Sequence, residues 1–220
     1  MKQILLIGNP NCGKTTLFNR ITGLNQKTSN LPGTTVEAYK GKVKIQSEYY
    51  QIIDLPGIYS LFSNTEYEQV VNKHLLGHSL GKPDLVVFVL DTSNLRRNLL
   101  LFSQVAELGI PSAGILTMTD TAKRRNIPTK IDHISKELGI PIIGANPRKD
   151  KNITSILGII HDAKIPNRLS TNSGFKERLE QSLSGEKVKG SSEETLRRYA
   201  DIDVIIKRLN DGNGIRSHFN

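Results

Sequence analysis

The sequence is poor in the residue types that mark several common protein classes. Cys12 is its only cysteine, so an internal disulfide is excluded and a cytosolic protein is the default expectation. Tryptophan is absent and aromatic residues make up 5% of the chain, which argues against a base-stacking surface for single-stranded nucleic acid. No apolar run reaches the roughly 18 residues of a membrane-spanning helix, and Met1 to Gln3 lead straight into a strand pattern without room for a signal peptide. We therefore expect the chain itself to be soluble.

The charge balance is strongly basic. Lysine and arginine number 30 against 21 aspartates and glutamates, which gives a formal net charge of +9. Such an excess suits contact with phosphates, nucleic acid or an anionic membrane surface. Because the charges are scattered and not grouped in blocks, ordinary solvated surface lysines explain the excess equally well. A chain of 220 residues has room for one main domain with a small appendage.

The most informative motif is a glycine-bounded loop near the N-terminus. It lies between an apolar strand pattern at 4–7 and a helical pattern at 16–21, and it reads Gly8-Asn9-Pro10-Asn11-Cys12-Gly13-Lys14-Thr15. This is the P-loop spacing: two glycines let the backbone curl so that its N–H groups point at a polyphosphate, where the following helix N-terminus adds partial positive charge. Lys14 would reach the outer phosphates and the Thr15 hydroxyl would bind Mg²⁺. The motif predicts a nucleotide ligand.

A second motif follows a predicted β-hairpin. Strand patterns at 36–45 and 49–54 are joined by a turn, and the second one ends in Asp54-Leu55-Pro56-Gly57. A carboxylate at a strand terminus, followed by a glycine free to approach a ligand, occurs where nucleotide-hydrolysing switches keep the acid that faces Mg²⁺. The preceding residues 25–35 are polar and rich in turn formers, so they predict a mobile loop.

Strand and helix patterns alternate over the remainder of the first 165 residues. We expect strands at 84–91, 110–118 and 140–143, and helices at 66–78, 94–108, 131–138 and 153–161, with Gly109 and Gly139 as C-terminal caps. The unbroken apolar run within 84–91 is typical of a central parallel strand that is buried on both faces. The pattern predicts an α/β fold: a mostly parallel, doubly wound sheet with one antiparallel strand from the hairpin.

The pattern changes near residue 166. Residues 167–220 contain no strand pattern, only polar helical patterns at 175–183 and 193–209, the second with Ser192 as a candidate N-cap. Two short helices cannot bury much apolar surface unless they pack on another part of the chain. We therefore predict a nucleotide-binding domain over 1–165 and a small C-terminal helical domain, reduced or truncated, over 166–220.

Three sequence blocks occur in a fixed order: the loop and helix start from Gly8 to Asn19, the block Pro32-Gly33-Thr34-Thr35-Val36-Glu37, and the block Asp54-Leu55-Pro56-Gly57-Ile58-Tyr59-Ser60-Leu61. Together they resemble the N-terminal G domain of the bacterial ferrous iron transport protein B (FeoB) family. A weaker likeness to the helical domain of that family covers 198–203. The resemblance implies a P-loop GTPase-like fold and a GTPase activity.

The resemblance also implies roles in phosphate binding and hydrolysis. Lys14 and the loop amides would hold the β- and γ-phosphates, and Gly57 would sense the γ-phosphate. Asn11 lies where cation-activated members hold K⁺, which would offset the charge that develops on the transferred phosphoryl group. After the glycine that corresponds to Gly57, many GTPases carry a glutamine that orients the attacking water. The residue here is Ile58, so hydrolysis is expected to be slow unless backbone groups and K⁺ take over the role of that glutamine. The positions expected to act in catalysis are Lys14, Asn11, Thr35 and Gly57.

A magnesium site follows from the same likeness. Thr15 and Thr35 would coordinate Mg²⁺, Asp54 would hold it through water, and Thr34 competes for the role of Thr35. The complete set of implied nucleotide-binding positions is Asn9, Pro10, Asn11, Cys12, Gly13, Lys14, Thr15, Thr16, Gly33, Thr34, Thr35, Asp54, Gly57, Thr117, Met118, Asp120, Asn146 and Pro147.

Two departures from the family pattern affect the nucleobase. At the end of the strand predicted at 110–118, family members usually have Asn-Met-x-Asp, whereas here Thr117 replaces the asparagine and Asp120 alone remains. Where the pattern requires Ser-Ala beside the guanine O6, this chain has Asn146 and then Pro147, which has no N–H to donate. Each lost polar partner costs about 1–3 kcal/mol, so we expect weaker guanine affinity and poorer discrimination against adenine. A replacement contact from Asn146 is the alternative.

Histidines raise the question of a transition metal. His74 and His78 are four residues apart on a predicted helix, but no third ligand accompanies them, and an exposed polar helix face is the preferred interpretation. His133, His161 and His218 are isolated. We predict no transition-metal site formed by the protein.

The sequence leaves three functional hypotheses open. The first is the GTP-hydrolysing cytosolic domain of a ferrous iron transporter, bound to the cytoplasmic face of the inner membrane through a transporter portion that this chain lacks. Its ligands would be GTP and GDP, with ATP and ADP as alternatives, Mg²⁺ as cofactor, K⁺ as a candidate second cation, and no nucleic acid. The rivals are an RNA-binding ribosome-assembly GTPase and a nucleotide-binding module with little turnover. Whether the chain is an excised domain, and whether it forms homo-oligomers, stay open.

Overall fold

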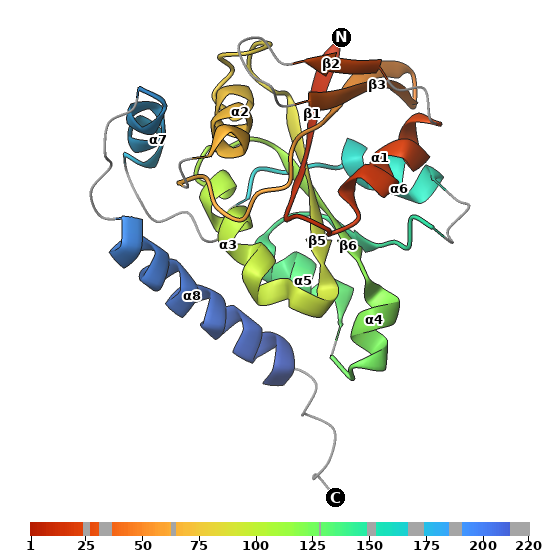
Figure 1. Cartoon of the computed structure of the whole chain (residues 1–220). Helices are drawn as coiled ribbons and strands as arrows, with labels where there is room; N and C mark the ends of the chain where they lie inside the picture. The colour runs from red at the N-terminus through yellow and green to blue at the C-terminus, as the bar shows by residue number, and fades with distance from the viewer. Residues whose placement is uncertain are drawn as a thin grey trace, which may run out of the picture.

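One sheet with helices on both faces forms the body of the molecule (Figure 1). The computed structural model describes residues 1–23, 27–30, 37–62, 65–127, 129–148, 153–166, 174–184 and 191–211, of which 27–30, 37 and 191 are described by their backbone alone. Within these ranges, no helix combines the length and the apolar composition that a membrane crossing requires.

The sheet has seven strands in the order β2-β3-β4-β1-β5-β6-β7. Strands β4, β1, β5, β6 and β7 are parallel, and β3 is antiparallel to both of its neighbours. The fold class is therefore confirmed: a mostly parallel, doubly wound sheet that contains one antiparallel strand. The strands are β1 (Lys2–Gly8), β2 (Lys27–Asn30), β3 (Glu37–Ile45), β4 (Glu48–Asp54), β5 (Leu85–Asp91), β6 (Ser112–Thr117) and β7 (Ile142–Gly144).

The helices pack on the sheet in two layers. Because successive side chains of a strand point to opposite faces, Leu5 and Ile7 of β1 belong to one buried cluster and Ile4 and Leu6 to the other. The first cluster includes residues of α2, α3, α5, α7 and α8, and the second includes residues of α1 and α6. The helices are α1 (Lys14–Thr22), α2 (Glu66–Leu75), α3 (Leu95–Ala106), α4 (Thr119–Arg124), α5 (Ile131–Leu138), α6 (Thr154–His161), α7 (Phe175–Leu183) and α8 (Ser191–Asp211), with a 3₁₀ turn η1 (Thr92–Asn94) before α3.

The structure corrects several local predictions. Residues 27–30 form β2, which pairs with β3, so the prediction of an unbroken loop over 25–35 is wrong there. A polar Lys-Thr-Ser-Asn strand has no apolar alternation, so only its backbone pairing reveals it. Helix α4 and the turn η1 were not predicted, and α3 ends at Ala106, before Gly109. Helix α8 begins at Ser191, so Ser192 lies inside it and is not its N-cap.

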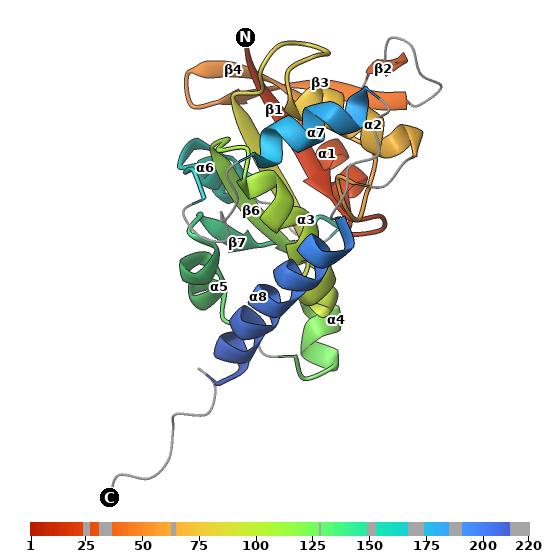
Figure 2. The ribbon, with the colours of Figure 1, turned by 90° about the vertical axis from the view of Figure 1, so that its left-hand side faces the viewer.

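Helices α7 and α8 pack on the first 165 residues of the chain. Figures 1 and 2 show α8 running across α3 and α7 beside α2. Phe175 of α7 and Ile202, Ile205 and Leu209 of α8 are buried in the same cluster as α3. The spacing of these α8 residues is that of one helix face, which explains how a mostly polar helix can be held there. The predicted domain boundary at residue 165 stays a prediction.

A buried arginine also connects α8 to α3. Arg198 is 4% exposed, and its guanidinium donates to the Ser103 carbonyl at 3.0 Å, to Glu107 Oε1 at 3.1 Å and to Glu194 Oε1 at 2.7 Å. The guanidinium also lies over the ring of Phe175, 5.0 Å from its centroid. Because buried charges are tolerated only when they are paired and hydrogen-bonded, this network determines how α8 packs on α3.

We predict that Arg198→Leu destabilises the chain by about 3–5 kcal/mol, because it removes the cation that compensates the buried carboxylate of Glu107. The matched control is Arg96→Leu, since Arg96 also joins α3 to α8 through Asp203, but with side chains that are 52% and 53% exposed. An exposed pair contributes about 0–1 kcal/mol. Urea unfolding of both variants measures the difference, and equal losses would contradict the assignment.

Candidate functional site

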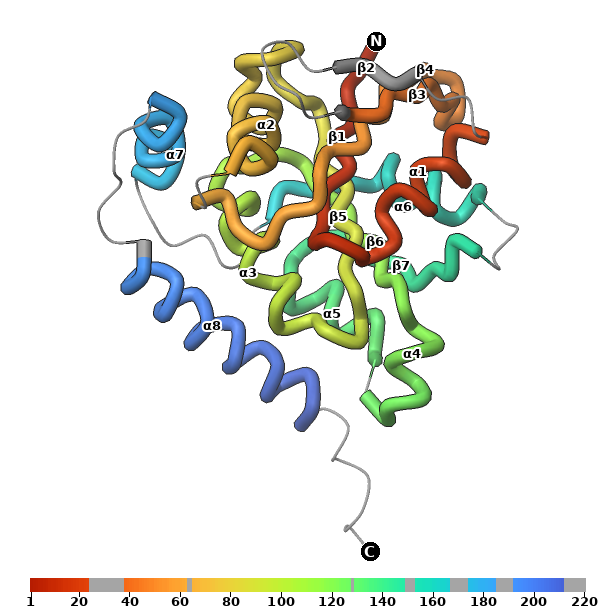
Figure 3. Tube along the Cα trace, in the orientation of Figure 1, coloured from red at the N-terminus to blue at the C-terminus, as the bar shows by residue number. Residues whose placement is uncertain are grey.

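The loop from Gly8 to Thr15 follows the carboxyl end of β1, a central strand that lies between β4 and β5 in the sheet. Figure 3 shows the chain running down β1, bending at its end and turning back into α1. In the strand register, Leu6 is opposite Asp54 of β4 and Gly8 is opposite Val89 of β5. Since the carboxyl ends of parallel strands lie at one edge of a sheet, the loops after β1, β4 and β6 meet there.

Backbone geometry explains the glycines of this loop. Gly13 immediately precedes α1 and has φ of +90°, a left-handed conformation that glycine adopts without strain. Gly8 has a different reason, because a Cβ atom there would lie 2.5 Å from the Val89 carbonyl oxygen and 2.7 Å from Cys12 Sγ. Asn11, which is exposed, also has a positive φ of 63°. The loop is therefore tightly curled against β5, as a phosphate-binding backbone must be.

Two polar side chains of the loop and of α1 converge on Asp54. The Lys14 ammonium is ion-paired with Asp54 Oδ1, and Thr15 Oγ1 donates to Asp54 Oδ2 at 2.8 Å. The side chains of Lys14 and Asp54 are only 8% and 2% exposed. An ammonium group, a hydroxyl and a carboxylate are thus brought together from sequence positions 40 residues apart. Such a set can hold a polyphosphate together with a divalent cation that prefers oxygen ligands.

The segment after Asp54 packs directly on the first loop. Leu55 N donates to the Leu6 carbonyl and Ile58 N to the Gly8 carbonyl, both at 3.3 Å. A Cβ atom on Gly57 would lie 2.8 Å from Pro10 Cα, so only glycine permits this approach. The structure therefore brings together the two motifs that the sequence singled out.

Ile58 points into the apolar core. Its side chain is 2% exposed and belongs to the cluster that includes residues of α2 and α3. This side chain has no group that can orient water and does not lie at the protein surface.

Thr117 lies at the end of β6 and contacts the first loop. It is 1% exposed, and its hydroxyl lies 2.6 Å from the Cys12 carbonyl and 3.3 Å from the Leu90 carbonyl. The hydroxyl has one proton to donate, and the shorter distance assigns it to Cys12. Its neighbour Met118 has φ of +55° and directs the chain into α4. Thr117 therefore contacts the loop through its hydroxyl, and its expected place beside the nucleobase stays a prediction.

The other predicted base-contacting residues follow β6 and β7 at the same edge of the sheet, in helix α4 and in the loop after β7. Asp120 is exposed in the first turn of α4, where its Oδ1 accepts from Thr121 N at 3.0 Å. Asn146 and Pro147 follow β7, and Asn146 Oδ1 accepts from Arg148 N at 3.2 Å. Of the remaining predicted positions, Gly33, Thr34 and Thr35 lie outside the described residues.

Two side chains that no motif singled out hold the segment after Gly57. Gln104 of α3 accepts from Leu61 N and donates to Ser60 Oγ, while Asn72 of α2 donates to the Leu61 carbonyl. Each lies within an ordinary helical pattern, and the sequence carries no signal for a contact that only packing of the two helices creates.

The histidine interpretation requires a correction. His74 is 3% exposed, and its Nδ1 lies 2.9 Å from the Val70 carbonyl, so it does not belong to an exposed polar face. Burial lowers the pKa of its imidazole. His78 is exposed but follows the end of α2 at Leu75. In the part of the chain that the structure describes, no three His, Cys, Asp or Glu side chains are grouped to hold a metal ion.

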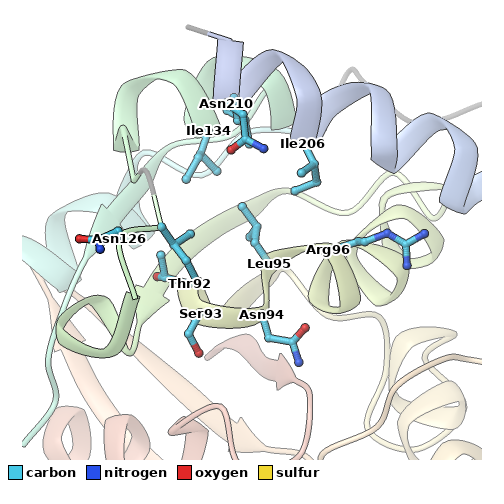
Figure 4. A pocket seen from close by; sticks show the side chains of 11 residues that line it. Thr92, Ser93, Asn94, Leu95, Arg96, Asn126, Ile134, Ile206 and Asn210 are labelled. Carbon is cyan, nitrogen blue, oxygen red and sulfur yellow. The ribbon is translucent and has the colours of Figure 1, made fainter. Parts of the chain in front are cut away.

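A cavity of about 360 Å³ lies between η1, the start of α3, α5 and α8 (Figure 4), and no residue of the loop from Gly8 to Thr15 lines it. Its walls combine apolar side chains, Leu95, Ile134 and Ile206, with polar ones, Thr92, Asn126 and Asn210. None of the predicted nucleotide-binding positions that the structure describes lines it.

Comparison with known sequences identifies relatives of this chain. The family model described as ferrous iron transport protein B matches residues 2–160. The Fe(2+) transporter FeoB of Leptospira interrogans is 39% identical over 154 residues, which are 70% of this chain and 22% of the relative. The Fe(2+) transporter FeoB of Escherichia coli strain K12 is 41% identical over 155 residues, which are 69% of this chain and 20% of the relative. This chain thus spans about a fifth of the length of these relatives.

Solved structures show the same likeness. The cytosolic domain of L. pneumophila FeoB has a TM-score of 0.77 and 29% identity, over 94% of this chain and 98% of that one. A mutant of S. thermophilus NFeoB bound to mGDP has a TM-score of 0.71 and 28% identity, over 96% of this chain and 91% of that one. The G domain of Methanococcus jannaschii FeoB has a TM-score of 0.61 and 34% identity, over 73% of this chain and 97% of that one.

We predict that the Cys12 thiol is unreactive in the folded chain. Its side chain is 1% exposed, and burial raises its pKa to about 11, with Lys14 acting in the opposite direction. The neutral thiol is therefore the folded form below that pH, and at pH 8 roughly one thiol in a thousand is the reactive thiolate. Iodoacetamide labelling followed by mass spectrometry should be at least about 100-fold slower in buffer than in guanidinium. Equal rates would contradict the buried loop geometry.

Proposed function

This chain belongs to the ferrous iron transport protein B family, and from that premise we propose that it is the GTP-hydrolysing and switching domain of a ferrous iron transporter. The convergence of Lys14 and Thr15 on Asp54 carries the proposal. These are the positions where the family motif requires a phosphate-binding ammonium, a magnesium-binding hydroxyl and an acidic group near the metal. The proposal places the domain at the cytoplasmic face of the membrane, beside a transporter portion that this chain does not include.

In the proposed complex, the curled backbone from Asn11 to Lys14 donates N–H groups to the β- and γ-phosphates, and the Lys14 ammonium exchanges its contact with Asp54 for the phosphate oxygens. The Thr15 hydroxyl and the Asp54 carboxylate are hard oxygen donors 2.8 Å apart, so they suit Mg²⁺, with Thr35 as the third protein group. Bound Mg²⁺ would neutralise charge on the phosphates during phosphoryl transfer.

Turnover is proposed to be slow. Ile58 occupies the place of the water-orienting glutamine, and its burial in the apolar core supports this. Backbone groups beside Gly57 would orient the attacking water. Asn11, exposed at the turn of the loop, would hold K⁺ near the phosphates, and that charge would replace an arginine finger.

Guanine recognition is proposed to be weak. Because the Thr117 hydroxyl is committed to the Cys12 carbonyl, it does not contact the base, and Asp120 alone would accept hydrogen bonds from guanine. Pro147 supplies no N–H for the guanine O6. ATP and ADP are then realistic competitors of GTP and GDP, unless Asn146 supplies a contact.

A nucleotide-binding module with little turnover is the second candidate, and the buried Ile58 favours it. Single-turnover hydrolysis in K⁺ and in Na⁺ separates the two functions. A rate in K⁺ well above the spontaneous rate supports the switch, whereas bound triphosphate that stays intact in both salts supports the module.

We predict that Lys14→Ala weakens binding of Mg²⁺ with GTP or GDP by roughly 10- to 100-fold, because charge-assisted hydrogen bonds to the phosphates are lost. The matched control is Lys42→Ala, an exposed lysine of β3, which should bind as the wild type does. Titration with fluorescent nucleotide measures both. Unchanged affinity in Lys14→Ala, or no binding of any purine nucleotide by the wild type, would overturn the proposed function.

We predict that the wild type binds GDP and ADP with dissociation constants within about tenfold of each other. Because one polar contact to the base contributes about 1–3 kcal/mol, Thr117→Asn should raise the preference for guanine by about tenfold. Thr121→Asn, at the third residue of α4, is the control. Calorimetry with GDP and with ADP measures the preference. A guanine preference of about a thousandfold in the wild type would refute weak recognition.

A further inference from the structure

The segment from Gly57 to Leu61 contacts the phosphate-binding loop at its near end and side chains of α2 and α3 at its far end, and between them Arg97 of α3 lies over the Tyr59 ring, 3.8 Å from its centroid. At the near end, Gly57 approaches Pro10 more closely than a Cβ atom would allow, and Ile58 N donates to the Gly8 carbonyl at 3.3 Å. These contacts connect the segment to the phosphate-binding loop. They are long or purely steric, so they can be exchanged when a ligand occupies that loop.

The far end is held differently. Leu61 N donates to Gln104 Oε1 at 2.8 Å, and the Leu61 carbonyl accepts from Asn72 Nδ2 at 2.8 Å. Both peptide groups of one residue are thus satisfied by side chains from two different helices, α3 and α2. Leu61, Gln104 and Asn72 are 1%, 1% and 3% exposed. Water cannot replace these partners, so loss of either amide leaves a buried backbone group unsatisfied.

Gln104 also contacts the residue before Leu61. Its Nε2 donates to Ser60 Oγ at 3.0 Å, and the same oxygen accepts from Phe62 N at 3.2 Å. Both ends of the Gln104 amide are therefore used, one as acceptor and one as donor. A single buried side chain fixes the path of the chain over Ser60 to Phe62.

We propose that Gln104 and Asn72 are positioning residues that make Leu61 a fixed pivot for the segment that responds to the γ-phosphate. The inference rests on the proposed nucleotide-dependent function. With Ser60 and Leu61 held by Gln104, only Gly57 to Tyr59 need to rearrange for the Gly57 N–H to meet a γ-phosphate, and the conformational entropy lost on ordering is limited to those residues. A diphosphate has no γ-phosphate for the Gly57 N–H to contact, so its binding does not depend on the pivot.

The test is Gln104→Met, which keeps side-chain length and volume but removes both hydrogen bonds. We expect the affinity for a non-hydrolysable GTP analogue to fall roughly tenfold, the affinity for GDP to stay within about twofold, and kcat to fall more than KM changes. Gln69→Met, an exposed glutamine of α2, is the matched control and should change none of these. Thermal melting of each variant without nucleotide reports on folding separately.

Two further variants keep the proposal falsifiable if Gln104→Met is unstable. Asn72→Leu removes the other partner of Leu61 and should give the same selective loss of triphosphate affinity. Gln104→Glu keeps an acceptor for Leu61 N, so it should restore triphosphate binding to within about threefold of the wild type at acidic pH, where the buried carboxyl group is neutral.

The outcomes separate this inference from the proposed function. If the wild type binds and hydrolyses nucleotide but Gln104→Met and Asn72→Leu lose GDP and GTP affinity equally, or lose only thermal stability, the pivot is refuted while the function stands. If the wild type binds no nucleotide, the proposed function itself fails.

Discussion

The parallel pairing of β4 with β1 is the constraint on which the site depends. It places Asp54 opposite Leu6, two residues before the first loop begins, so the carboxylate lies against Lys14 and Thr15 without any contribution from distant loops. The same pairing continues past the strand ends through Leu55 and Ile58, which brings Gly57 against Pro10. Alternate residues of both strands are buried in the two apolar clusters on opposite faces of the sheet, so helices pack on this strand pair from both sides.

The part of the site that we propose binds the nucleobase depends on the contact between Thr117 and the Cys12 carbonyl. At the end of β6, the short hydroxyl side chain of Thr117 donates to the Cys12 carbonyl, and this contact stabilises the loop from Gly8 to Thr15. A longer amide could support the loop and extend towards a base at the same time, whereas one hydroxyl proton serves one acceptor. In the proposed complex, loop stability and base recognition would therefore be separated, and the phosphate-binding part would keep its geometry independently of the base.

The packing of α2, α3, α7 and α8 connects the site to the C-terminal helices. Gln104 holds the segment after Gly57, and the neighbouring Ser103 carbonyl accepts from Arg198 of α8. One turn of α3 thus contacts both the segment at the site and the last described helix. Because both contacts are buried and polar, they hold the far end of that segment and helix α8 on the same turn of α3.

The sequence by itself determined the phosphate loop, the Asp54 motif, the alternation of strands and helices, and the need of α7 and α8 for a surface to pack on, because local backbone preferences and hydrophobic periodicity are written in neighbouring residues. Only the tertiary structure decided that a polar segment at 27–30 pairs as a strand, that His74 is buried, that Thr117 contacts Cys12, and that Gln104 and Asn72 hold Leu61. Each of these depends on what another element places beside the residue, and periodicity carries no information about that partner.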